Sequence, residues 1–381
     1  TSGDFIETLF EETNDRYVEP EHPARFLTHD PSKFLWWSER DGYNHLYLYS
    51  DNGKLIKQVT KGEWIVTDYH GESEDGKYLF ITATKDSPIE RHLYKVSLKN
   101  CKITKLTSSA GYHSIVANQN NSLFLDDFSS TRNPREVRLI DENGTVSEIL
   151  YKADNPLMDY KLGEMEIGKL TGESGDDLYY RIFKPIDFDS SKKYPVVVYL
   201  YNGPHLQLIK NQWMGGANLW YQYMAQKGYV VFSIDGRGSA NRGFEFESSI
   251  FRNCGENEMI DQLSGVNWLK SQMWVDSNRL GVHGWSYGGY MTTSMMSRHP
   301  GVFKVGVAGG PVIDWSLYEV MYTERYMDTP EENPEGYDKT NLKNHLDSLQ
   351  GKLLMIHGGL DDVVLWQHSL QFLESAIKKG V

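Results

Sequence analysis

The stretch Gly284-Trp285-Ser286-Tyr287-Gly288 restricts the possible folds of this chain more than any other feature. It fits the pattern Gly-x-Ser-x-Gly, in which a serine sits on a sharp turn between a strand and a helix. Glycines two positions before and after the serine let the strand and the helix approach without clashes between Cβ atoms. The hydroxyl then stands above the sheet, and the N–H of the next residue, Tyr287, points at any oxyanion formed there. Ser286 is therefore the candidate nucleophile.

The residues around this motif support the same interpretation. Residues 279–283 are typical of a short buried strand, and residues 291–298 of a helix that ends before His299-Pro300-Gly301. Other buried strands are predicted at 195–201, 229–235, 305–310 and 353–358, and helices at 219–228 and 257–270. Such alternation indicates a mostly parallel sheet with helices on both faces. Together with the serine turn it predicts an α/β-hydrolase domain over residues 161–381.

The first part of the chain has a different pattern, of short strands between turn signals. His45, His92 and Glu136 begin equivalent strands, at intervals of 47 residues (45 to 92) and 44 residues (92 to 136). A four-stranded unit that recurs at this interval is typical of β-propeller blades, and a β-sandwich with coincidental spacing is the alternative. Residues 1–160 are therefore predicted to form a partial β-propeller of about three blades. Because closed propellers have about four to eight blades, further blades are expected before residue 1.

Composition excludes several classes of partner. The net charge of −13 argues against nucleic acid and anionic membrane surfaces. No run of eighteen apolar residues is present, so no transmembrane helix is expected. The two cysteines fall in different predicted domains, and no clustered histidines or cysteines suggest a metal, so neither a disulfide nor a metal or other cofactor is expected. The chain begins without methionine, so its start carries no information about location.

A serine nucleophile needs a base and an acid that orients the base, and in this fold the order is serine, acid, histidine. Asp361 follows the predicted strand at 353–358 and is the candidate acid; its alternative role, as a helix cap, suits Asp362 better. After Asp361 the chain holds one histidine, His368, inside a predicted helix at 365–379, and His357 precedes the acid. Neither histidine suits the role of the base, so we expect a chain that is truncated before its catalytic histidine and inactive alone. The order of triad residues predicts that histidine after Asp361, and we expect it about thirty positions further on.

Three motifs resemble the dipeptidyl peptidase IV branch of the prolyl oligopeptidase family: residues 284–290 (GWSYGGY), 235–239 (DGRGS) and 322–327 (YTERYM). The resemblance runs from about residue 17 to residue 381 and is weakest in the blades. Within the branch, residues 318–326, 332–337 and 363–370 are most similar to prolyl tripeptidyl aminopeptidases. The family joins a β-propeller to an α/β-hydrolase domain and removes short N-terminal peptides after proline.

The resemblance also implies roles for individual residues. Ser286 matches the nucleophile, Asp361 the triad acid, and Tyr201 the tyrosine whose hydroxyl forms the oxyanion hole with the Tyr287 N–H. Five apolar or aromatic residues match the walls of a proline pocket, although without the resemblance they would read as ordinary core: Val312, Trp315, Tyr318, Tyr322 and Val364.

Glu319 matches the glutamate with which tripeptidyl enzymes hold the ammonium group of the substrate. Lying on one predicted helix between Tyr318 and Tyr322, it is expected to be a desolvated carboxylate that needs such a partner; a surface ion pair is the alternative. Val363 stands where dipeptidyl peptidase IV carries an asparagine that binds a substrate carbonyl, which puts strict dipeptidyl specificity in doubt.

These observations predict a serine exopeptidase that releases tripeptides or dipeptides after proline through an acyl-enzyme, acting on peptides with proline near the N-terminus. One alternative is an acylaminoacyl-peptidase or esterase on the same fold, against which the proposed ammonium ligand argues. The other is a non-catalytic propeller binding protein with a relic hydrolase domain, against which the intact Ser286, Asp361 and Tyr201 argue. The resemblance favours a periplasmic or extracellular location and allows a homodimer.

Overall fold

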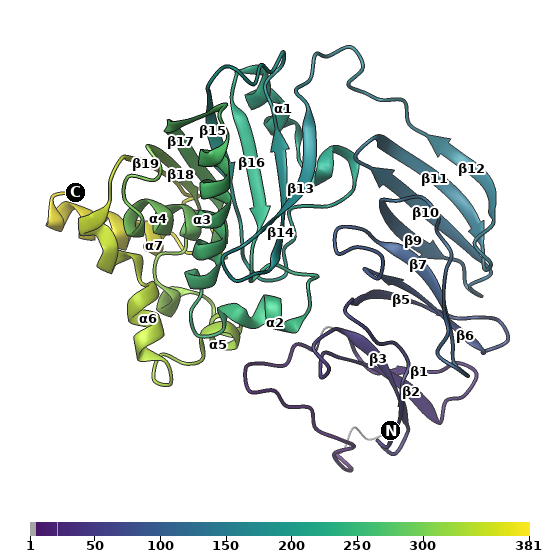
Figure 1. Cartoon of the computed structure of the whole chain (residues 1–381). Helices are drawn as coiled ribbons and strands as arrows, with labels where there is room; N and C mark the ends of the chain where they lie inside the picture. The colour runs from purple at the N-terminus through teal and green to yellow at the C-terminus, as the bar shows by residue number, and fades with distance from the viewer. Residues whose placement is uncertain (1–4, 21) are drawn as a thin grey trace. The chain divides into compact units, whose positions relative to one another are not determined.

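The computed structural model describes residues 5–20 and 22–381 (Figure 1). The chain forms two compact units. The first runs to Asn155 and also contains residues 210–213 and 241–245, and the second contains the remainder. The main division thus falls five residues before the boundary expected at residue 160, and two short segments of the later sequence fold with the first unit.

The first unit consists of three four-stranded antiparallel sheets, each built from four consecutive strands in sequence order. Figure 1 shows them in purple to blue. The first comprises β1 Arg25–Phe26, β2 Lys33–Ser38, β3 His45–Ser50 and β4 Leu55–Gln58; the second, β5 Val66–Glu72, β6 Tyr78–Ala83, β7 His92–Ser97 and β8 Ile103–Lys105; the third, β9 Tyr112–Ala117, β10 Leu123–Ser130, β11 Asn133–Asp141 and β12 Val146–Lys152. This is the architecture of propeller blades, as the repeat in the sequence predicts.

Apolar side chains join neighbouring blades. One buried cluster combines Leu35 and Leu46 of the first blade with Leu79 and Ile81 of the second. A second cluster combines Phe80 of the second blade with Phe124 and Ile140 of the third. Because successive side chains of a strand point to opposite faces, β6 contributes to both clusters, and the middle blade is apolar on both sides.

A shared hydrogen-bond pattern explains the repeating histidine. His45 Nδ1 lies 3.0 Å from the hydroxyl of Thr60, fifteen residues later, and this hydroxyl also accepts from the Leu46 N–H. His92 makes the same contact with Thr107 at 2.9 Å. Each histidine therefore ties the start of the third strand of its blade to the segment that leaves the fourth.

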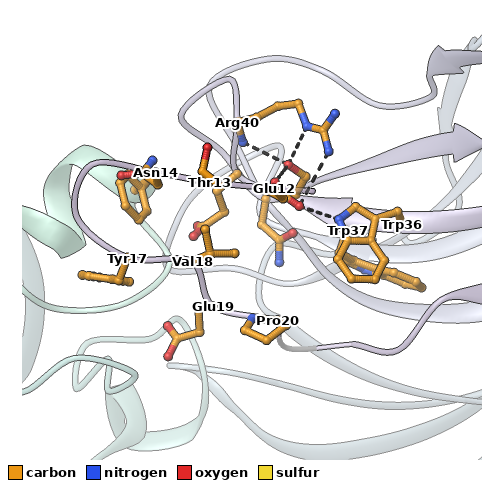
Figure 2. Close-up of a pocket in the computed structure, with 14 residues that line it drawn as sticks. Glu12, Thr13, Asn14, Tyr17, Val18, Glu19, Pro20, Trp36, Trp37 and Arg40 are labelled. Atoms are coloured by element: carbon orange, nitrogen blue, oxygen red, sulfur yellow. Dashed lines mark hydrogen bonds and ion pairs between the residues drawn. The ribbon is translucent and has the colours of Figure 1, made fainter. Parts of the chain in front are cut away.

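The N-terminal segment crosses the first blade and is held by one acidic side chain. The Glu12 carboxylate accepts hydrogen bonds from Trp36 Nε1 and the Ser38 hydroxyl, and lies 3.6 Å from Arg40 Nη2. Figure 2 shows Glu12 facing Trp36 and Arg40 at a small cavity. Its volume of about 30 Å³ leaves room for water only. The cavity contains no residue that the sequence analysis assigns to the active site, so we attribute it to the attachment of this segment.

The second unit is built on a seven-stranded sheet with the order β13-β14-β16-β15-β17-β18-β19. Its strands are β13 Met165–Thr171, β14 Asp177–Phe183, β15 Tyr194–Tyr199, β16 Val230–Asp235, β17 Val275–Trp285, β18 Val305–Gly309 and β19 Lys352–Ile356. The pairings of β14 are antiparallel and the others are parallel, so the sheet is mixed. This arrangement, with the turn after β17, is an α/β-hydrolase sheet.

Helices connect the strands of this sheet (Figure 1). The α-helices are α1 Leu219–Gln226, α2 Phe244–Glu247, α3 Glu256–Ser271, α4 Tyr287–Arg298, α5 Val320–Met327, α6 Pro334–Thr340 and α7 Gln367–Lys379; the 3₁₀ turns are η1 Trp213–Gly216, η2 Ser248–Ile250, η3 Trp315–Leu317 and η4 Leu342–Ser348. α4 packs against β17 and β18, and α3 against β17. In the part of the chain that the structure describes, no helix is both long and apolar enough to cross a membrane.

Candidate active site

Ser286 lies at the sharp turn between β17 and α4, with φ 58° and ψ −117°. Close backbone approach explains the flanking glycines. A Cβ on Gly284 would lie 2.4 Å from the Gly288 carbonyl oxygen, and one on Gly288 would lie 2.4 Å from that of Leu200. Both contacts are far inside van der Waals distance, so the strand, the helix and the end of β15 can meet here only through glycine.

Backbone hydrogen bonds fix this turn. The Ser286 N–H donates to the Gly309 carbonyl at 2.8 Å, and the Ser286 carbonyl accepts from Tyr290 at 3.0 Å. Tyr287 is the first residue of α4, where a backbone N–H has no partner within the helix. The N–H of Tyr287 is therefore placed to serve as a donor to an anion beside Ser286.

Tyr201 follows β15 and lies beside the serine. Burial raises the pKa of the Tyr201 hydroxyl, and a side-chain hydrogen bond with Ser286 partly offsets this rise. The rings of Tyr201 and Tyr287 lie 6.2 Å apart between their centroids. The structure therefore brings together the nucleophile and both donors of the predicted oxyanion hole.

Asp361 lies in the turn after β19, where its Oδ1 accepts from the N–H groups of Val363 at 3.1 Å and Val364 at 2.9 Å. Two adjacent glycines link this turn to the serine. Gly309 accepts from the Ser286 N–H, while a Cβ on Gly310 would lie 3.5 Å from Asp361 Oδ2. The candidate acid and the candidate nucleophile thus both lie next to the same two residues of backbone.

The two histidines near Asp361 have other partners. His357 Nε2 lies 3.7 Å from Asp361 Oδ2, but both ring nitrogens lie 2.7 Å from other groups, the Ser369 hydroxyl and the Val364 carbonyl. His368 is buried in α7, its Nδ1 accepts from the Ile313 N–H, and burial lowers its pKa to about 4. Among the described residues, no histidine is hydrogen-bonded to Ser286.

Aromatic residues from η3 and α5 form a cluster next to Tyr287. The Trp315 ring lies 5.4 Å from that of Tyr287 and stacks on Tyr322 at 6.1 Å. Tyr318 packs edge-on against both Trp315 and Tyr322. The remaining two predicted wall residues, Val312 and Val364, are buried. An aromatic cluster therefore lies beside Tyr287, at the residues for which the sequence predicts the walls of a pocket for a flat apolar ring.

The structure places Glu319 in a different environment from the buried helix position that the sequence predicts. No helix spans residues 318–322, because α5 begins at Val320, and Glu319 is its exposed N-cap. Its carboxylate accepts from the Met321 N–H at 3.0 Å. Because Glu319 is exposed and acts as a helix cap, the expectation of a desolvated carboxylate is wrong. A role for Glu319 toward substrate has to be proposed on other grounds.

Three polar side chains of α3, to which the sequence analysis assigned no role, also lie against the site. Glu258, Asp261 and Gln262 are each almost completely buried. Their spacing of three and four residues puts them on one face of the helix. That spacing was visible in the sequence, but polar residues on a helix are usually solvated, so the pattern alone did not indicate a buried cluster.

Two family models match the chain. The model of the prolyl oligopeptidase family matches residues 217–381, and the model of the dipeptidyl peptidase IV N-terminal region matches residues 2–135. The first match lies mainly in the second unit, and the other lies in the first unit. The fold and the serine turn define an α/β-hydrolase joined to propeller blades.

Relatives and solved structures agree with this class. Mouse (Mus musculus) dipeptidyl peptidase 8 is 32% identical over 98% of this chain and 46% of its own length. A probable dipeptidyl peptidase 4 from Emericella nidulans is 32% identical over 90% of this chain and 46% of its own length. A putative dipeptidyl aminopeptidase IV from Bacteroides ovatus superposes with a TM-score of 0.92 at 43% identity, over 97% of this chain and 55% of the other. Porphyromonas gingivalis dipeptidyl peptidase 4 gives 0.91 at 33% identity, over 97% and 52%.

The chain belongs to the prolyl oligopeptidase family, in the branch of dipeptidyl peptidase IV, as its motifs predict. It spans about half the length of the relatives and solved chains that it matches.

Proposed function

We propose that the whole protein containing this chain is a serine exopeptidase that removes short peptides from the N-termini of its substrates by cutting after proline. The observation that carries this proposal is the meeting of Ser286, Tyr201 and the first N–H of α4 beside the aromatic cluster of Trp315, Tyr318 and Tyr322. The names of the relatives, which are dipeptidyl peptidases, support the same activity.

The chemistry assigned to the site is acyl transfer. The Ser286 oxygen attacks the carbonyl carbon of the proline residue while its proton passes to a histidine base. The oxyanion accepts hydrogen bonds from the Tyr201 hydroxyl and the Tyr287 N–H. Collapse of this intermediate breaks the C–N bond, and the histidine returns the proton to the leaving amine. Water then hydrolyses the acyl-enzyme by the same steps.

The histidine and the acid complete the proposal. Asp361 is assigned as the group that orients the base, because it follows a strand after the serine turn and its Oδ2 lies near Gly310, next to the residue that accepts from the Ser286 N–H. The order of triad residues in this fold places the histidine after Asp361 in the chain. His357 and His368 are not assigned this role, since each is engaged elsewhere.

The proline ring is assigned to the aromatic cluster. A pyrrolidine ring offers no side-chain hydrogen bonds, so flat apolar walls recognise it by contact area. Val312, Trp315, Tyr318, Tyr322 and Val364 are the proposed walls. Glu319 is proposed as a ligand of the substrate ammonium group. Its exposure in this structure means that it can reach a ligand only at the rim of the site.

Two lengths are proposed for the released peptide, namely two residues and three residues. The names of the relatives favour dipeptides. Val363 favours tripeptides, because a valine side chain cannot donate the hydrogen bond to a substrate carbonyl that an asparagine donates.

The test uses the whole protein with chromogenic Ala-Pro and Ala-Ala-Pro derivatives, and Ser286→Ala as the matched control. We expect release of the chromophore by the wild type and none by the variant. N-acetylated Ala-Pro is the second control, since it lacks the ammonium group. Faster cleavage of the acetylated peptide would indicate an acylaminoacyl-peptidase. A wild type that turns over none of these and fails to react with a fluorophosphonate would be a binding protein with a relic hydrolase domain.

A further inference from the structure

We propose that helix α3 positions both donors of the oxyanion hole, with Glu258 fixing Tyr287 and Gln262 fixing the segment that carries Tyr201. This inference rests on the function proposed above. Glu258 and Gln262 are separated by one helical turn, so a single rigid element would set the distance and orientation between two donors that come from different loops.

Glu258 holds the Tyr287 side. It is fully buried, and its Oε1 accepts from the Tyr287 hydroxyl and, at 2.9 Å, from the Gly255 N–H. The backbone of Tyr287 begins α4, and its side chain ends at Glu258. Tyr287 is therefore anchored at both ends, and its N–H cannot turn away from Ser286 without breaking a buried hydrogen bond.

Gln262 holds the Tyr201 side. Its Nε2 donates to Asn202 Oδ1 at 2.7 Å and to the Ile234 carbonyl at 3.0 Å. Asn202 directly follows Tyr201 and has φ 66°, in the left-handed region, which asparagine adopts more readily than most residues with a side chain. The hydrogen bond from Gln262 holds the Asn202 side chain and so fixes the direction in which Tyr201 leaves β15.

Asp261 holds helix α3 against the segment that follows β16. Its carboxylate accepts from the Arg237 N–H at 2.7 Å and from the Arg237 guanidinium at 3.0 and 2.9 Å. Arg237 lies two residues beyond the end of β16, the strand that carries Ile234. The polar face of α3 is thus tied to the end of the sheet from which Tyr201 also projects, and α3 cannot shift independently of that end.

The side chains of Tyr201 and Tyr287 pack closely around Gly203. A Cβ on Gly203 would lie 2.7 Å from the Tyr201 ring and 2.9 Å from Tyr287 Cγ, so the two side chains pack against one residue. A displacement of about 1 Å in a catalytic group can reduce a rate about a hundredfold. Glu258 and Gln262 are therefore positioning residues, which act on the reaction through Tyr287 and Tyr201 without touching substrate.

The test replaces each side chain in the whole protein by an unbranched apolar one of similar length, in Glu258→Met and Gln262→Met. Asn267→Met is the matched control, because Asn267 lies on the exposed face of the same helix. Each of the first two variants is expected to lower kcat about 10- to 100-fold and to change KM less than about threefold. Glu258→Gln keeps the acceptor for Tyr287 and is expected to restore kcat to within about threefold of the wild type.

Inhibitor binding separates positioning from a general loss of structure. A proline-type boronic acid, whose tetrahedral adduct places an oxygen in the oxyanion hole, should bind the Met variants at least about tenfold more weakly. A non-covalent proline amide should bind as it does to the wild type. Unchanged kcat in both variants, or equal weakening of both inhibitors, would overturn the proposal. If Glu258→Met does not fold, Tyr287→Phe removes the same hydrogen bond from its other end, and the same pattern is expected.

The proposed function and this inference can fail separately. If the wild type cuts no proline peptide, the exopeptidase proposal is wrong. The rate of fluorophosphonate labelling of Ser286 then decides the inference, because the phosphonyl oxygen needs the same two donors and no peptide is involved. Slower labelling in both Met variants and wild-type labelling in Asn267→Met would support the role of α3. Equal rates in all four proteins would exclude it.

Discussion

The Ser286 backbone has φ 58° and ψ −117°, a combination that costs about 1–3 kcal/mol for a residue with a Cβ. The proposed function requires the side chain here, so the protein carries this strain at its proposed nucleophile. We predict that the free energy of unfolding of Ser286→Gly is about 1 kcal/mol higher than that of Ser286→Ala, as measured by denaturant or thermal unfolding. Glycine relieves the backbone strain, and this gain exceeds the entropy that glycine adds to the unfolded state. Both variants lack the hydroxyl, so the comparison isolates the backbone. A Ser286→Gly protein that is less stable than Ser286→Ala by about 0.4–1 kcal/mol would mean that the turn is unstrained, since only the entropy of the unfolded state would then separate the two.

The Tyr201 side chain interacts with the Ser286 side chain through a hydrogen bond. We predict that Tyr201→Phe lowers kcat about 10²- to 10³-fold with little change in KM, because the lost hydroxyl is a proposed donor to the developing oxyanion. Steady-state kinetics on a proline chromogenic substrate measure this. Phenylalanine keeps the ring packing, so an unchanged kcat would identify Tyr201 as a packing residue.

At the scale of elements, α3 carries a buried acid whose ionisation is coupled to stability. Burial raises the pKa of Glu258 from 4.5 to about 7, although its hydrogen bonds from Tyr287 and Gly255 lower it. The folded state therefore holds this proton more tightly than the unfolded state. Its contribution to stability is present below pH 4.5 and is lost as the pH rises through 7, and it amounts to about 3 kcal/mol.

We predict that the stability of the wild type falls relative to Glu258→Gln between pH 5 and pH 8. Glutamine cannot ionise and keeps the acceptor for Tyr287, so the difference between the two proteins isolates the titration of Glu258. Urea unfolding at a series of pH values measures it. A difference that stays constant across this range would show that Glu258 does not change ionisation there.

Local sequence patterns predicted the elements, but the interactions between elements came only from the structure. The glycine spacing around Ser286 and the apolar run at 195–201 were sufficient for the turn and for the sheet. The helix after the serine begins at Tyr287, four residues earlier than predicted, and it includes Gly288 and Gly289, which close backbone contacts require. The sequence did not predict the exposed capping position of Glu319, because that position depends on the residue at which α5 begins. The α3 contacts join residues 29 and 60 positions apart, a separation at which a pattern in one sequence predicts nothing.

At the scale of the whole protein, the proposed function makes the number of residues released depend on the distance between the proposed ammonium ligand and Ser286. An extended peptide advances about 3.3–3.6 Å per residue, so dipeptidyl and tripeptidyl enzymes need ligands at distances that differ by about that much. Contacts with the substrate backbone between the ammonium ligand and Ser286 also affect which peptide length is preferred. Val363 lies in the Asp361 turn with an exposed side chain, and its N–H donates to Asp361 Oδ1. It is therefore a position from which a side chain can reach substrate without disturbing the fold.

We predict that Val363→Asn shifts the preference of the whole protein toward dipeptides. Asparagine supplies an amide donor for a substrate carbonyl, and a neutral hydrogen bond is worth about 0.5–1.5 kcal/mol, so the ratio of kcat/KM for Ala-Pro to that for Ala-Ala-Pro should rise about three- to tenfold. Val363→Leu is the matched control, since leucine has a similar size to asparagine and no donor, and it should leave the ratio unchanged. Chromophore release from both peptides by the three proteins gives the ratio. An equal rise in Val363→Leu would assign the effect to side-chain size, and no rise in Val363→Asn would place the selection of peptide length elsewhere in the whole protein.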